Sequence, residues 1–82
     1  MIIRNEDISE VIAEIPGKHK HIRTTLKLQS GEEITFEEAA IANIVRAYIS
    51  IKTHPVNERI VLKGRMLDKR KDGYANWQLL EV

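Results

Sequence analysis

The chain has 82 residues and a formal net charge of +1, and 30% of its residues are charged and 43% hydrophobic. This length and balance are typical of one small folded domain and argue against disorder, while the absence of cysteine excludes disulfides and thiolate metal sites. No segment approaches the roughly 20 apolar residues of a membrane span and no signal peptide is visible, so we expect one cytoplasmic domain over residues 1–82 with no membrane partner.

The pattern of residues 5–15 predicts a first helix. Asn5 suits the N-cap position, where a side-chain oxygen accepts a hydrogen bond from a backbone N–H. The apolar residues behind it recur at helical spacing, and they are Ile8, Val11, Ile12 and Ile15. Pro16 and Gly17 then end the helix, because these residue types interrupt regular structure. The preceding segment, residues 1–3, fits either a short strand or a frayed end.

Residues 19–28 predict a strand, because apolar and polar residues alternate there. A turn follows. A three-residue loop at 30–32 places Leu28 opposite Ile34, which agrees in polarity, whereas a two-residue loop places it opposite a glutamate. We therefore expect a hairpin whose second arm, residues 33–35, is short and continues into a helix.

The segment Thr35–Thr53 predicts a long helix with a marked start and a marked end. Thr35 and Glu38 fit a capping box, and Pro55 disfavours helical geometry in the residue before it. At ~100° per residue, large apolar side chains spread over an arc of roughly 160°. These are Ile41, Ile44, Val45, Tyr48, Ile49 and Ile51. A narrower polar stripe on the other side contains Asn43, Arg46, Ser50 and Thr53.

The apolar arc of this long helix is wider than the stripe of about 100° that packing on one sheet requires. The helix therefore needs a second apolar surface, which either the first helix or a second copy of the chain can supply. We expect self-association into a homodimer through residues of the arc, namely Ile41, Val45, Tyr48 and Ile49.

Two further strands are predicted over residues 58–68 and 74–81, joined by a turn at 69–73. Their register is open between two alternatives. In one register Gly64 pairs with Trp77, so the indole ring lies in the core and covers the glycine. A shift by one residue turns the ring to the outer face. The first register is favoured because burying the tryptophan removes more apolar surface from water than burying the smaller side chains of the alternative.

Positive charge gathers in two segments of the predicted sheet. Outward-pointing side chains and the second turn form a basic surface of Arg23, Lys27, Lys63, Arg65, Lys69, Arg70 and Lys71. Such a cluster attracts phosphates by Coulomb attraction and counterion release. The ordinary interpretation is a solvated sheet face whose lysines blunt an edge strand, and the net charge near zero favours it. Nucleic-acid binding is the alternative.

Side chains for catalysis or metal binding do not converge in this sequence. His19 and His21 share a strand face, but a metal site needs at least a third ligand. The glutamates of residues 32–38 span a turn and a helix start, where they complement the helix dipole. No nucleotide-binding, protease or hydrolase motif occurs. We therefore expect no enzymatic activity, cofactor, metal or small-molecule substrate.

Together these elements predict an α+β fold in the order α-β-β-α-β-β. A two-layer sandwich, with both helices on one face of a single antiparallel sheet, is the simplest way to bury their apolar sides. The functional prediction is a non-enzymatic, self-associating interaction module. The alternative is a nucleic-acid-binding domain that uses the basic sheet face and the basic turn.

Overall fold

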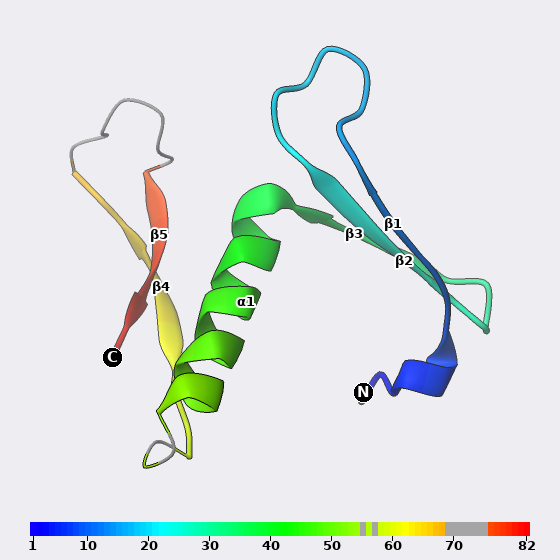
Figure 1. The fold of residues 1–82 in the computed structure, drawn as a ribbon. Helices are drawn as coiled ribbons and strands as arrows, with labels where there is room; N and C mark the ends of the chain where they lie inside the picture. Colours follow the sequence, from blue (N-terminus) through cyan, green and yellow to red (C-terminus); the bar gives the residue numbers. More distant parts are fainter. Residues whose placement is uncertain (55, 57, 69–75) are drawn as a thin grey trace. The chain divides into compact units, whose positions relative to one another are not determined.

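The computed structural model describes residues 1–54, 56, 58–68 and 76–82 (Figure 1). In this part of the chain the elements are η1 (Asn5–Asp7), β1 (Ile8–Glu14), β2 (Arg23–Leu28), β3 (Glu33–Glu37), α1 (Glu38–Thr53), β4 (Leu62–Met66) and β5 (Trp77–Glu81). The strands form two antiparallel sheets, one of β1-β2-β3 and one of β4-β5. The α+β class is therefore confirmed. The predicted order is wrong, because the observed order is β-β-β-α-β-β and two sheets replace the single one.

The chain divides into two compact units, Met1–Ala42 and Asn43–Val82. The first unit contains the three-stranded sheet and the start of α1. The second unit contains the rest of α1 and the β4–β5 hairpin. The single domain expected over residues 1–82 stays a prediction.

Strand β1 occupies the segment for which the sequence predicts a helix, and that prediction is wrong. A β-bulge explains why its apolar residues have helical spacing. Ile8 lies opposite Leu28 and Val11 opposite Leu26, and the register shifts by one residue between Ile8 and Glu10. The extra residue brings Ile8 and Val11, three positions apart, to the same face of the sheet. Their β-branched side chains also favour a strand.

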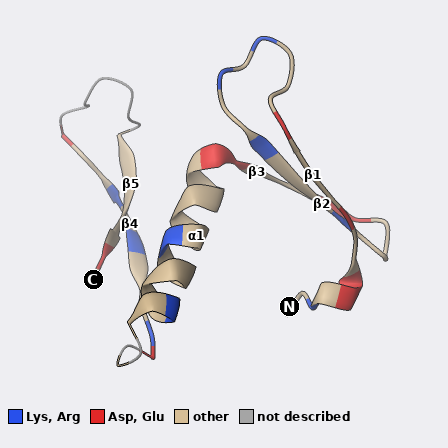
Figure 2. Ribbon diagram, in the orientation of Figure 1, with Lys and Arg blue, Asp and Glu red and all other residues tan. Residues whose placement is uncertain are grey.

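The three-stranded sheet places most of its apolar and polar residues on opposite faces, with Ile12 on the polar face opposite Thr25. The apolar face contains Ile8, Val11, Leu26, Leu28, Ile34 and Phe36. The polar face contains Glu10, Glu14, Arg23, Lys27, Glu33 and Glu37, so both signs of charge occur there (Figure 2). The bulge residue Ser9 is fixed to β2, because its hydroxyl donates a hydrogen bond of 2.9 Å to the carbonyl oxygen of Lys27.

Strands β2 and β3 form the predicted hairpin, and its loop has the predicted length of three residues but lies one residue earlier, at 29–31. The Gly31 amide donates to the carbonyl oxygen of Leu28 at 2.9 Å. Gly31 has a φ of 95°, a conformation that glycine adopts without strain. Ile34 therefore lies opposite Leu26 instead of Leu28. Because the pairing moves by two residues, every side chain keeps its predicted face.

Strand β3 runs directly into α1, which begins at Glu38 and ends at Thr53. The predicted helix end is confirmed, but the predicted start at Thr35 is three residues early. The capping box is also wrong. The Thr35 hydroxyl forms a hydrogen bond of 2.9 Å with the Thr25 hydroxyl across the sheet, and the Glu38 carboxylate lies 2.8 Å from His21 Nδ1. A cross-strand contact therefore engages Thr35, and a contact with the segment before β2 engages Glu38, so neither side chain serves as the predicted cap.

The β4–β5 hairpin pairs Gly64 with Leu79 and Met66 with Trp77. Neither predicted register is observed, but Trp77 shares a face with Gly64, as in the favoured one. A Cβ atom built on Gly64 would overlap the indole ring, so the glycine leaves room for the tryptophan. The predicted contact between Trp77 and Gly64 is confirmed, but the prediction that the indole ring lies in the core is wrong, because the tryptophan is 56% exposed. Residues 69–75, which include the predicted turn, lie outside the described residues.

Replacing Gly64 by alanine should lower the free energy of unfolding by about 1 kcal/mol, because the added methyl group displaces the indole ring. Alanine is otherwise preferred over glycine in a strand, so a loss of stability would indicate that the added methyl group collides with the Trp77 ring. Trp77 is the single tryptophan, and its fluorescence can follow urea unfolding directly. In a Trp77→Leu background, followed by circular dichroism, the same substitution should be less harmful. An equal loss in both backgrounds would contradict the packing.

Candidate functional site

The candidate site is the apolar face of α1, which consists of Ile44, Val45, Tyr48 and Ile49. Their exposed fractions are 55%, 44%, 61% and 51%, respectively. Three of them belong to the predicted self-association set, whose fourth member, Ile41, is half-buried. The prediction omits Ile44 from that set, although its spacing of four residues from Tyr48 places it on the same side of the helix.

The opposite side of α1 is more covered than the apolar face. Ala47 and Ser50 are half-buried, and the Arg46 guanidinium donates a hydrogen bond to the carbonyl oxygen of Leu79 in β5. Arg46 and Ser50 belong to the stripe that the sequence identifies as polar. Within the unit Asn43–Val82 the helix is thus tied to the hairpin by its polar side, and the large apolar side chains are left exposed.

Opposite charges flank the apolar face along the helix. Glu38 lies in the first turn of α1 and Lys52 in the last turn, where each complements the helix dipole (Figure 2). At ~100° per residue, both residues point to the side of the apolar face. Lys52 Nζ lies 5.9 Å from the centroid of the Tyr48 ring, within the range of a cation–π contact. The sequence analysis assigns Glu38 to a helix cap and does not name Lys52, although the helical spacing places both on the side of the apolar face.

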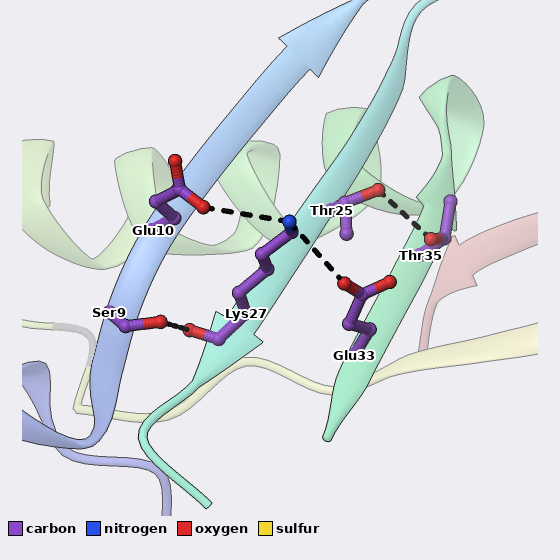
Figure 3. Close-up of polar contacts among 6 residues, drawn as sticks. All are labelled: Ser9, Glu10, Thr25, Lys27, Glu33 and Thr35. Atoms are coloured by element: carbon purple, nitrogen blue, oxygen red, sulfur yellow. Dashed lines mark hydrogen bonds and ion pairs between the residues drawn. The ribbon is translucent and has the colours of Figure 1, made fainter. Parts of the chain in front are cut away.

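The basic residues of β2 lie between acidic residues of the neighbouring strands. Lys27 Nζ is 3.6 Å from Glu10 Oε2 and 3.5 Å from Glu33 Oε1 (Figure 3). Arg23 Nη1 is 3.6 Å from Glu37 Oε2. Four glutamates and two cations share this face, so the positive charge that the sequence assigns to it is compensated. This compensation weakens the attraction of the sheet for phosphates.

The other basic residues of the prediction belong to the second hairpin. Lys63 and Arg65 lie on one face of β4, opposite to the face that carries Trp77, and both are exposed. Within the described ranges, neither is in ion-pair contact with a carboxylate. The remaining three, at positions 69–71, lie outside these ranges. Among the described residues, the structure therefore brings two of the seven predicted basic residues together without a carboxylate in contact with either.

Other groupings of polar side chains offer little chemistry. In the described part of the chain, no group of three or more His, Cys, Asp or Glu side chains could hold a metal ion. His21 lies against a carboxylate of α1. A pocket beside the β2–β3 turn is lined by residues 1–3, residues 28–30 and Asp7. Its single titratable side chain, Asp7, accepts a hydrogen bond of 2.9 Å from the Arg4 amide.

Comparison with known proteins does not identify a family for this chain. No family model matches the chain, and no curated protein or solved structure is significantly similar to it. Among the residues that the structure describes, no helix combines the length and the apolar character needed to cross a membrane. The function therefore has to be inferred from the apolar face of α1 and from the charges around it.

Replacing Lys27 by methionine should lower the free energy of unfolding by about 0.5–1 kcal/mol at low ionic strength, because Glu10 and Glu33 lose the cation between them. Urea unfolding at low and high salt measures the effect, which should shrink as salt screens the glutamates. Lys63→Met makes the same change at a position where no carboxylate of the described residues forms an ion pair with the lysine, and it should alter the stability less. A loss that is independent of salt would contradict the electrostatic explanation.

Proposed function

We propose that this protein is a non-enzymatic module that self-associates through the apolar face of α1. The observation that carries the proposal is the exposure of four large apolar side chains on one side of the helix. Soluble proteins rarely leave a contiguous apolar patch uncovered unless it is an interaction site. A second copy of the chain is the simplest partner, because one face used by both copies gives a closed two-fold dimer.

The attachment of α1 within its own unit supports the proposal. The hydrogen bond from Arg46 to the carbonyl oxygen of Leu79 fixes the side of the helix that faces away from Val45 and Tyr48. The apolar face is thus presented on a helix whose other side is already engaged. Such a preorganised surface loses little conformational freedom on binding.

Replacing Val45 by aspartate should raise the dissociation constant of the dimer at least about tenfold, because an unpaired carboxylate would be buried in the interface. Size-exclusion chromatography with light scattering over a concentration series measures the change. Ala39→Asp places the same charge at an exposed position on the other side of α1 and should leave the dimer intact. A wild-type chain that stays monomeric at high micromolar concentration would contradict the proposal.

Nucleic-acid binding is the second candidate, and the observation that favours it is confined to β4. Lys63 and Arg65 are exposed on one strand face without a carboxylate in contact among the described residues. Arg23 and Lys27 support it less, because glutamates compensate both. The candidate thus depends on the second hairpin, with residues 69–71 as its predicted extension.

Reversing both β4 charges, with Lys63→Glu and Arg65→Glu, should weaken binding to single-stranded RNA or to DNA at low salt. Binding by the wild-type chain should also fall steeply as salt rises, because phosphate contacts release counterions. Lys27→Gln is the matched control and should change the affinity little. Fluorescence anisotropy with labelled oligonucleotides measures these effects. If no salt-sensitive binding to either nucleic acid is observed, this candidate is excluded.

A further inference from the structure

On the basis of the proposed self-association, we propose that the two copies of α1 pair antiparallel about a two-fold axis. The apolar faces of the two helices then cover each other, and Glu38 of each copy meets Lys52 of the other. The partner is a second copy of this chain in one defined orientation. Two observations support this orientation: the position of the apolar face along α1 and the sign of the charge at each end of the helix.

The apolar face lies close to the middle of α1. Its first and last residues, Ile44 and Ile49, have their midpoint between positions 46 and 47, while the midpoint of Glu38–Thr53 lies between positions 45 and 46. An antiparallel partner centred on the face therefore covers all of it. The two helices also overlap over almost their whole length in this arrangement.

Helical geometry divides the apolar face into two rows. At ~100° per residue, Ile44 and Tyr48 lie on one side of its midline, and Val45 and Ile49 lie on the other. A two-fold axis normal to the plane of two antiparallel helices keeps each row on its own side. Ile44 then packs against Tyr48 of the second copy, and Val45 packs against Ile49 of the second copy. The rise per residue places the members of each pair within ~1.5 Å along the helix axis.

The charges at the two ends of α1 distinguish the antiparallel arrangement from a parallel one. In the antiparallel pair, Glu38 lies about 4.5 Å along the axis from Lys52 of the second copy, within reach of a lysine side chain. In a parallel pair the two copies of Glu38 would face each other, and so would the two copies of Lys52. Like charges at close range destabilise such a pair. The helix dipoles add to the antiparallel preference, because opposite ends meet.

Contacts within one copy leave both charged groups available to the other. The Glu38 carboxylate uses Oε2 for its 2.8 Å contact with His21, and the side chain remains 41% exposed. Lys52 is exposed in the last turn of α1, with its ammonium group above the Tyr48 ring. Tyr48 is the ring that Ile44 of the second copy would cover, so the lysine lies at the rim of the apolar contact.

Cysteine cross-linking tests the orientation, because the natural chain contains no cysteine. Ile41 and Lys52 lie equally far on either side of the expected two-fold axis. In an antiparallel pair, position 41 of one copy therefore meets position 52 of the other, whereas two copies of either position are about 16 Å apart along the axis. A disulfide tolerates a Cα separation of only ~7 Å. Under mild oxidation, Ile41→Cys mixed with Lys52→Cys should give a disulfide-linked dimer, and each variant alone should not.

Charge exchange gives a second, independent test. Glu38→Lys and Lys52→Glu should each weaken the dimer about tenfold in light scattering, because each converts two attractions into repulsions. The double variant restores opposite charges in the antiparallel pair and should recover most of the affinity. Circular dichroism of the monomers controls for loss of helix through altered interactions with the helix dipole.

The outcomes separate this inference from the proposed function. A disulfide-linked dimer in each variant alone would show a parallel pair and overturn the inference while the proposed function stands. A dimer in light scattering that forms no disulfide in any sample would also overturn the inference. A chain that is monomeric at every concentration would overturn the proposed function itself.

Discussion

In the part of the chain that the structure describes, many large apolar side chains remain exposed to solvent. Among the residues that the structure describes, Leu28 alone is buried, at 8% exposure. Antiparallel hydrogen bonds join the strands within each sheet, but Val11 and Ile15 in the first unit and Ile44 and Tyr48 in the second remain exposed. Burial of apolar surface is the main favourable term in folding. Covering these side chains is therefore the most direct way for this chain to gain stability.

The first strand shows why part of the fold was beyond prediction from the sequence. A helix and a bulged strand both bring Ile8 and Val11 to one side, so the spacing of apolar residues cannot decide between them. The β-branched content of the segment favours the strand and is the signal that could have been weighed more heavily. The prediction succeeded where a local signal was unambiguous. The end of α1 at Thr53 is the example.

The same error in β1 explains the overestimate of the basic surface. If residues 5–15 are a helix, Glu10 is not a neighbour of Lys27, whereas strand pairing places them directly opposite each other. The apolar arc of α1 was predictable from helical spacing alone. The sequence could not show which side of that helix would be engaged, because this depends on a tertiary contact from Arg46 to the backbone at Leu79.

The central claim is that a second copy of the chain covers the apolar face of α1. Isotope-filtered nuclear Overhauser spectra of a mixture of methyl-labelled and unlabelled chains test it most directly. We expect intermolecular signals from the Ile44 methyl groups to the Tyr48 ring and from the Val45 methyl groups to Ile49. Intermolecular signals that avoid these residues, or none at concentrations where the labelled methyl groups are well resolved, would contradict it.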